Sequence, residues 1–284
     1  MASQVFVDVY TVPPFHTDTG SPDPIKQLWS PTNVTLIHTA TTAIVCDCPP
    51  TIAETEKLAT WIQETIPTKK VAYFFATHAH ADHFFGFPVL AKRFPGIEAV
   101  ATKSVAEGAK HQYDMDIWEK WWGNGRLPSE RVVFKALPES NELELDGVGM
   151  KAYDVANADC SFNSYLHVPA LRLVVACDIV YGDCYQYLVE ANTQEKRANW
   201  IKALDDIAAL DPHIVIPGHA RKTQVFGAYL IESTRRYIAV FAEELEKAQS
   251  AEDLMARMKQ LYPERWNLFL LEGSCAASFA NKRK

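Results

Sequence analysis

The chain of 284 residues lacks several features that mark specialised classes of protein. It contains no run of about 18 apolar residues, so we expect no transmembrane helix and no membrane partner. Its first residues lack a basic start followed by an apolar stretch, which is the pattern of a secretory signal, so we expect a cytoplasmic protein. Lys and Arg total 28 against 35 Asp and Glu, and this acidic balance argues against a nucleic-acid partner.

The six cysteines form no C-x-x-C pair and no small-domain disulfide framework. We therefore expect free thiols in a reducing compartment, with Cys46 and Cys48 as small strand residues. The chain also lacks a G-x-S-x-G motif and a G-x-G-x-x-G motif. These absences disfavour a serine or cysteine nucleophile and a phosphate-binding loop.

The residues that are present form alternating strand and helix patterns over the whole length. With 48% hydrophobic and 22% charged residues, the composition is that of a globular protein. Interleaving of this kind favours a layered α/β sandwich. Strands are predicted at 4–12, 34–48 (a pair), 70–77, 97–102, 131–136, 142–145, 150–155, 163–168, 171–177 and 213–216, and helices at 54–65, 84–93, 105–122, 194–210 and from 225 onward.

The clearest chemical signal follows the predicted strand 70–77. Residues 77–83 read Thr-His-Ala-His-Ala-Asp-His, which crowds three imidazoles and one carboxylate into a loop at a strand end. Imidazole and carboxylate are the natural ligands of zinc and of its neighbours among the transition metals. The motif therefore predicts a metal site, with the ligands His78, His80, Asp82 and His83.

On these residues the chain resembles the metallo-β-lactamase-fold superfamily of metallohydrolases. Residues 173–178, Leu-Val-Val-Ala-Cys-Asp, are similar to the family strand that ends in a metal-bridging aspartate, here Asp178. Residues 214–219, Ile-Val-Ile-Pro-Gly-His, are similar to the strand that ends in a further ligand, here His219. The resemblance implies a four-layer αββα sandwich of two mixed β-sheets flanked by helices. It also implies one domain over 1–284, with 224–284 as a helical C-terminal extension packed on it.

The chain departs from the family at one expected ligand. The family usually has a histidine in the loop between the first motif and the bridging aspartate. Counting back from the turn at Val168 and Pro169 puts Asn157 at that position, and an amide oxygen is a far poorer zinc ligand than imidazole. Asp159 is the alternative ligand in the same loop, against the reading that it is a solvated loop carboxylate.

The resemblance then implies two unequal metal half-sites. One half-site lacks its third imidazole, and the other is complete. The first consists of His78, His80 and Asp178, and the second of Asp82, His83, His219 and Asp178. We expect the complete half-site to hold its ion more tightly, and the first to be weak, empty or unusual in its ion.

A metal centre of this kind predicts hydrolysis. Metal coordination lowers the pKa of bound water towards about 7, so that a metal-bound hydroxide forms near neutral pH. Asp82 would orient this water as well as bind metal, and Tyr181 either hydrogen-bonds a substrate oxygen or is structural. We expect one or two zinc ions, with iron or manganese as alternatives. The leading function is zinc-dependent hydrolysis of a small ester-like or amide-like substrate, with a lactone or lactam ring most favoured.

Aromatic residues indicate where a small-molecule substrate would bind. Segment 113–122 contains Trp118, Trp121 and Trp122, and the loop 13–24 contains Phe15. Aromatic side chains suit a small organic ligand, so these residues are candidates to line the pocket. The alternatives are ordinary helix packing for segment 113–122 and a surface position for the loop.

Three other functions remain open. A thioesterase is disfavoured because its glyoxalase-type branch commonly has histidine at the position of Ala79. An iron-dependent oxidoreductase of the same fold depends on the identity of the metal. A metal-binding member without turnover is prompted by Asn157. β-Lactam resistance is disfavoured by the missing export signal, and the oligomeric state, including a homodimer, stays open.

Overall fold

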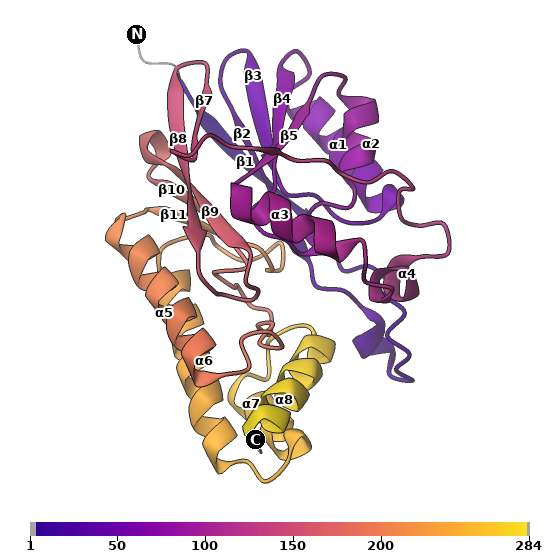
Figure 1. The fold of residues 1–284 in the computed structure, drawn as a ribbon, viewed down its shortest axis with the longest axis vertical. Helices are drawn as coiled ribbons and strands as arrows, with labels where there is room; N and C mark the ends of the chain where they lie inside the picture. Colours follow the sequence, from indigo (N-terminus) through magenta and orange to yellow (C-terminus); the bar gives the residue numbers. More distant parts are fainter. Residues whose placement is uncertain (1–3, 283–284) are drawn as a thin grey trace.

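The computed structural model describes residues 4–282 and contains two β-sheets that lie face to face (Figure 1). The first sheet has six strands in the order β1-β2-β3-β4-β5-β6, and the second has five in the order β11-β10-β9-β8-β7. The strands of the first sheet are β1 (Phe6–Val12), β2 (Thr32–His38), β3 (Thr42–Cys46), β4 (Lys70–Phe75), β5 (Glu98–Ala101) and β6 (Lys135–Ala136). Those of the second are β7 (Glu142–Leu145), β8 (Val148–Val155), β9 (Asn163–Val168), β10 (Leu173–Cys177) and β11 (Ile214–Pro217).

Both sheets are mixed. In the first, β1, β2 and β3 pair antiparallel, and β3, β4, β5 and β6 pair parallel. In the second, only β10 and β11 pair parallel. Parallel neighbours bring the carboxyl ends of β3 and β4, and of β10 and β11, to one edge of the molecule. That edge carries the motifs identified from the sequence.

Helices cover the outer face of each sheet and complete four layers (Figure 1). The first half of the chain supplies α1 (Ile52–Thr65), α2 (Phe87–Arg93), α3 (Lys103–Gln112) and α4 (Ile117–Trp122). The second half supplies α5 (Gln194–Ala209), α6 (Tyr229–Lys247), α7 (Ala251–Leu261) and α8 (Leu268–Lys282). Short 3-10 turns lie at Pro24–Gln27, Ala81–His83 and Pro169–Leu171. The αββα sandwich predicted from the resemblance is confirmed.

The apolar run of β4 shows how the layers hold together. Successive strand side chains point to opposite faces, so Phe75 packs between the sheets with Leu166 and Val175. Its neighbour Phe74 packs on the other side, under the helices. Both phenylalanine side chains are fully buried, and each burial is worth about 1.5–3 kcal/mol. A strand buried on both faces explains the uninterrupted apolar sequence.

Three predicted elements differ markedly from the structure. The predicted helix 105–122 is two helices, α3 and α4. The helix predicted from 84 begins at Phe87, because residues 84–86 form a turn. Gly86 in this turn packs closely, since a Cβ on it would lie 2.1 Å from the Pro49 carbonyl oxygen. The strand predicted at 131–136 is paired only over 135–136. Before that point the backbone N–H of Val132 donates to the Tyr113 hydroxyl, at 2.8 Å, instead of to a strand neighbour.

A carboxylate ties the two sheets together at the edge opposite the motifs. Asp146 lies in the turn between β7 and β8, with a positive φ of 50°. Its Oδ2 accepts hydrogen bonds from the hydroxyls of Thr39, Thr41 and Thr42, around the turn between β2 and β3. These hydrogen bonds lower the pKa of Asp146 to about 2.

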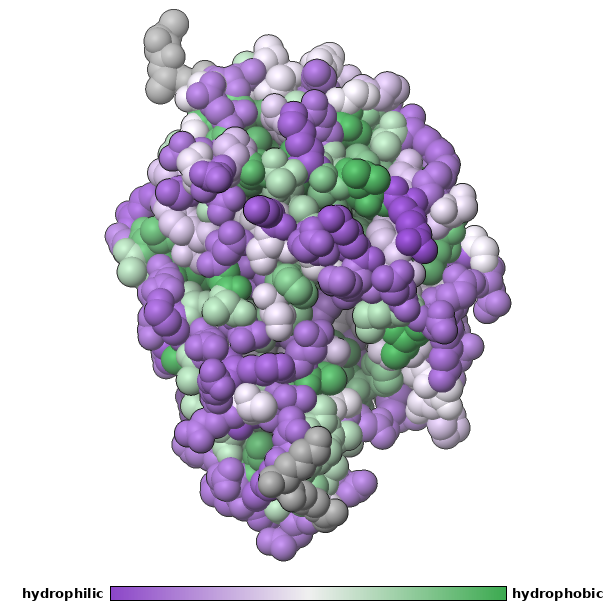
Figure 2. Space-filling model, in the orientation of Figure 1, coloured by the Kyte–Doolittle hydropathy of each residue, from purple (hydrophilic) through white to green (hydrophobic). Residues whose placement is uncertain are grey.

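Within the described residues, the C-terminal helices extend the second outer layer. The division into one domain with a helical extension over 224–284 stays a prediction. Helix α8 reaches both halves, since Leu270 packs in the core of the first half and Leu271 in that of the second. Within residues 4–282, no helix is both long enough and apolar enough to cross a membrane. Hydrophilic side chains cover most of the face shown in Figure 2, with apolar groups small and separate.

Candidate metal centre and its cavity

Side chains that follow four strands meet at one edge of the sandwich. Asp47 follows β3 and the histidine-rich loop 77–83 follows β4. Asp178 follows β10 and His219 follows β11. The two sheets are joined at this point, because the backbone N–H of Asn33 in β2 donates to the Gly218 carbonyl at 2.7 Å. The topology therefore brings together residues that lie more than a hundred positions apart.

His78 and His80 each direct one ring nitrogen inward and anchor the other. The Nδ1 of His78 lies 3.0 Å from the Thr77 hydroxyl, and its Nε2 faces Asp159 Oδ2 at 3.6 Å. The Nε2 of His80 lies 3.0 Å from Glu190 Oε1, and its Nδ1 lies 2.8 Å from the same Asp159 oxygen. An anchored outer nitrogen fixes the orientation of the ring, as in known metal-binding histidines.

His83 and His219 follow the same pattern on the other side. The Nδ1 of His83 lies 3.3 Å from Asp47 Oδ2, and the Nδ1 of His219 lies 3.2 Å from the Pro31 carbonyl oxygen. Their Nε2 atoms lie 3.3 Å and 3.5 Å from Asp82 Oδ2. All four histidines thus present one nitrogen each to a carboxylate-lined interior.

The interior carboxylates are held by aromatic donors. Trp29 Nε1 donates to Asp82 Oδ2 at 3.0 Å, and the Tyr181 hydroxyl donates to Asp178 Oδ2 at 2.8 Å. Asp178 also lies 3.2 Å from His219 Nε2 and 3.5 Å from His83 Nε2. The hydroxyl of Tyr181, predicted to meet a substrate oxygen or to be structural, is therefore engaged in positioning a carboxylate.

Burial and the histidine–carboxylate contacts set the charges of the centre. Burial lowers the pKa of His78 well below its usual value, with His83 adding to the effect, and neutral imidazole is the form that binds metal. Burial opposes charge on His219 too, but Asp178 and Asp82 outweigh it and raise the pKa of His219 to about 9. A cation bound among these groups would displace such protons, because the ligands must be deprotonated.

The polar atoms of the centre fit a cation better than they fit one another. Within residues 4–282, His78 Nε2, His83 Nε2 and Asp159 Oδ2 are buried without a hydrogen bond, although each lies close to another ligand-type atom. Buried polar groups are nearly always hydrogen-bonded, so such atoms require a partner. In three groups, ligand-type atoms lie within 4.8 Å of one another. The groups are His78, His80 and Asp159; Asp82, His83 and His219; and Asp47, His78, His83 and Cys177.

The structure decides between the two candidates in the loop after β8. Asp159 is fully buried and faces His78 and His80, whereas Asn157 is half-buried and its Nδ2 donates to Ser161 Oγ. Asn163 Nδ2 donates to Asp159 Oδ1 at 2.7 Å and so turns Oδ2 inward. The expected position of Asn157 beside the two histidines is corrected, because the loop turns Asp159 towards them instead.

The backbone next to Asp178 is closely packed. Cys177, the residue before it, has a left-handed φ of 43°, a conformation that costs energy for a residue other than glycine. On the neighbouring strand end, a Cβ on Gly218 would lie 1.8 Å from Asp178 Oδ1. The carboxylate therefore reaches its position only because residue 218 has no side chain.

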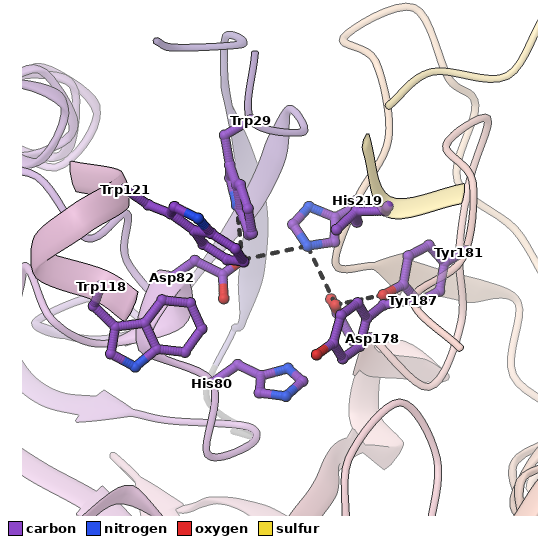
Figure 3. A pocket seen from close by; sticks show the side chains of 10 residues that line it. Trp29, His80, Asp82, Trp118, Trp121, Asp178, Tyr181, Tyr187 and His219 are labelled. Atoms are coloured by element: carbon purple, nitrogen blue, oxygen red, sulfur yellow. Dashed lines mark hydrogen bonds and ion pairs between the residues drawn. The ribbon is translucent and has the colours of Figure 1, made fainter. Parts of the chain in front are cut away.

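The centre opens into a cavity with an aromatic wall (Figure 3). His80, Asp82, Asp178 and His219 line this cavity. The remaining lining residues are Trp29, Trp118, Trp121, Tyr181, Tyr187 and Leu270.

Of the predicted pocket residues, Trp118 and Trp121 line the cavity, whereas Trp122 and Phe15 do not. Trp122 is fully buried behind the wall, and its Nε1 donates to Thr17 Oγ1. Phe15 packs 6.4 Å from the Trp122 ring in the same core. A six-residue helix such as α4 turns only part of its surface towards the cavity, so the tryptophans divide between wall and core.

Four residues important to the site were not singled out from the sequence: Trp29, Asp47, Tyr187 and Glu190. Only Asp47 gave a signal, since a carboxylate directly after a strand, between two cysteines, is a polar group where buried residues are expected. It accepts hydrogen bonds from both the backbone N–H and the hydroxyl of Thr77, at 2.9 and 2.8 Å. The other three reach the centre from segments that carry no motif.

The protein is thus an αββα sandwich of two mixed sheets enclosed by helices. Its candidate metal centre lies where histidines and carboxylates converge at the strand ends. The chain belongs to the metallo-beta-lactamase superfamily, whose family model matches residues 28–219. This membership indicates a metal-dependent hydrolase.

Several known proteins are similar to the chain. The "Metallo-beta-lactamase type 2" of Bacteroides fragilis is 24% identical over 227 residues, which cover 76% of this chain and 79% of that protein. A metallo-beta-lactamase from Pontibacter korlensis has a TM-score of 0.60 at 18% identity, covering 84% of this chain and 99% of its own. The mono-zinc form of FIM-1 from Pseudomonas aeruginosa has a TM-score of 0.58 at 17% identity, covering 83% and 91%. These structures support the fold.

Proposed function

We propose that the protein is a zinc-dependent hydrolase that opens small, uncharged lactone or lactam rings. The observation that carries the proposal is that the inward-facing groups of the centre and the tryptophan wall line one cavity (Figure 3). A ring stacked on Trp118 or Trp121 would have its carbonyl carbon close to Asp82 and His219.

Asp82, His83 and His219 would hold one ion, beside Asp178, while His78 and His80 would face the other. A divalent ion bound there supplies an acidified water at neutral pH and polarises the substrate carbonyl. Asp82 would orient the attacking water, take up its proton at the carboxylate, and return it to the ring oxygen or nitrogen as the bond from that atom to the carbonyl carbon breaks. Trp29 Nε1 keeps that carboxylate in place by its hydrogen bond.

The cysteines support attack by water rather than by a thiolate. All six are free and buried. Burial raises the pKa of Cys177, the cysteine that contacts Asp47 and His83, well above its usual value. A thiol that stays protonated at neutral pH is a poor nucleophile. The proposed reaction therefore uses no cysteine nucleophile.

The lining of the cavity supports an uncharged substrate. It includes no Lys or Arg within the part of the chain that the structure describes, but it does include the carboxylates Asp82 and Asp178. A substrate with its own carboxylate would therefore find no Lys or Arg side chain in this lining to pair with. The tryptophan rings instead favour flat or apolar groups.

Steady-state kinetics with the zinc-loaded protein test this proposal. The substrates are pairs of lactones and of lactams that differ only in one carboxylate. We expect kcat/KM for the uncharged member to exceed that of the charged member by about tenfold or more, which corresponds to about 1.4 kcal/mol. Asp82→Asn should lower kcat at least about 100-fold, whereas the control Asp206→Asn, on an exposed face of α5, should leave it unchanged. Absence of turnover on every uncharged ring would overturn the proposal.

The alternative functions give different results in the same assays. A thioesterase would cleave thioesters in preference to the matched lactones. An iron-dependent oxidoreductase would consume oxygen when loaded with iron and would hydrolyse nothing when loaded with zinc. A metal-binding protein without turnover would bind the ion and leave the whole panel intact.

A further inference from the structure

The two sides of the centre are built alike. In each group two histidines and one aspartate converge: His83, His219 and Asp82 on one side, and His78, His80 and Asp159 on the other. On each side one histidine is backed by a neutral oxygen and the other by a further carboxylate. A side that lacked a third ligand would not show this correspondence.

We propose that Asp159 is the third metal ligand of the half-site formed with His78 and His80, and that Glu190 is the positioning residue that fixes His80 with Nδ1 facing the ion. The proposal rests on the proposed function only in requiring a metal centre. It replaces the expectation of unequal half-sites with that of two complete ones.

The contacts of Asp159 support its assignment as a ligand. The side chain is fully buried, and a buried carboxylate is costly unless it is paired or binds a metal. One oxygen is satisfied by Asn163 Nδ2, and the other has no hydrogen bond although His80 Nδ1 lies 2.8 Å away. Two imidazoles and one carboxylate form a ligand set known from transition-metal sites.

Glu190 matches Asp47 in function but differs from it in exposure. Each accepts a hydrogen bond from the outer nitrogen of a histidine, Glu190 from His80 and Asp47 from His83. The Asp47 side chain is 2% exposed and that of Glu190 is 42% exposed. Carboxylates that orient metal-binding histidines contribute 10–100-fold to metal affinity. Because Glu190 is partly exposed, its replacement tests this contribution with little risk to the fold.

Metal counting on the full chain tests both assignments. The protein is stripped with a chelator and titrated with zinc, and bound metal is measured by mass spectrometry and calorimetry. We expect two ions per chain for the native protein, one for Asp159→Ala, and two again for Asp159→His. Asn157→Ala is the matched control in the same loop and should retain both ions. If Asp159→Ala keeps both ions at native affinity, or if Asn157→Ala loses one, the ligand assignment is overturned.

The role of Glu190 has its own measurement. Glu190→Ala should weaken one of the two zinc sites about 10–100-fold, and Glu190→Gln, whose amide oxygen still accepts a hydrogen bond, should restore part of that loss. The absorption spectrum of the cobalt-loaded protein should change for one ion only. Unchanged affinity and spectrum in Glu190→Ala would refute the positioning role. Two bound ions without turnover on the substrate panel would instead reject the proposed function and leave the ligand assignment intact.

Discussion

Replacing Gly218 by alanine should displace Asp178 and thereby impair the metal centre. The new Cβ would lie 1.8 Å from Asp178 Oδ1 and 2.9 Å from Cys177 Sγ. The carboxylate would have to retreat by about 1.6 Å to reach an ordinary contact distance of 3.4 Å. Gly218 does not have a left-handed φ, so alanine suits the backbone and the clash alone is tested.

The expected magnitudes of Gly218→Ala follow from this displacement. Overpacking of a well-packed site costs about 1–3 kcal/mol, equivalent to a fall in melting temperature of roughly 2–12 °C. A misplacement of about 1 Å in a catalytic group reduces kcat/KM by about 100-fold. Calorimetry measures the loss of stability and kinetics the loss of activity, and a zinc titration measures any accompanying loss of metal affinity. The control is Gly149→Ala, where nothing lies within 4 Å of the new Cβ. Native kinetics and metal affinity in Gly218→Ala would show that neither activity nor metal binding depends on the position of Asp178.

Three further substitutions test individual contacts. Trp29→Phe removes the donor to Asp82, so kcat/KM should fall roughly tenfold with the cavity wall retained; unchanged kinetics would contradict the positioning of that carboxylate. Asp47→Asn disrupts the buried hydrogen bonds to Thr77 and should lower the free energy of unfolding by about 2–4 kcal/mol in urea titrations, whereas native stability would count against this role. Asp146→Asn should destabilise the protein at neutral pH. Because hydrogen bonds lower the folded-state pKa of Asp146 to about 2, the stabilisation is present above pH about 4 and is lost as pH falls towards 2; a stability difference that is constant over this window would refute the argument.

The sequence predicted the parts of the site that are local to strand ends. The motif 77–83 and the residues Asp178 and His219 each follow a strand with a clear apolar pattern, and the order of parallel strands brings such ends together. The αββα fold followed from the same motifs through the family resemblance. Element bounds were least accurate where a turn replaced a regular element, as before Phe87.

The remaining features depend on contacts that periodicity does not encode. Asp159 rather than Asn157 faces the histidines because the side chain of Asn163 turns the loop, and no count of residues along the chain reveals that hydrogen bond. Trp29 and Tyr187 line the cavity only because their distant segments fold against the centre. Trp122, by contrast, looked like its neighbour Trp121 in sequence and differs from it only in the side of α4 that it occupies.

The segment between β10 and α5, residues 178–193, contributes both to the metal centre and to the substrate cavity. It supplies Asp178, the hydroxyl that holds it, the cavity residue Tyr187, and Glu190 behind His80. A substitution made here to admit a different substrate would alter the inner coordination chemistry as well. Helix α4 contributes to the cavity only through tryptophan side chains. Changes of substrate range are therefore best sought in α4, and adjustments of the metal centre in 178–193.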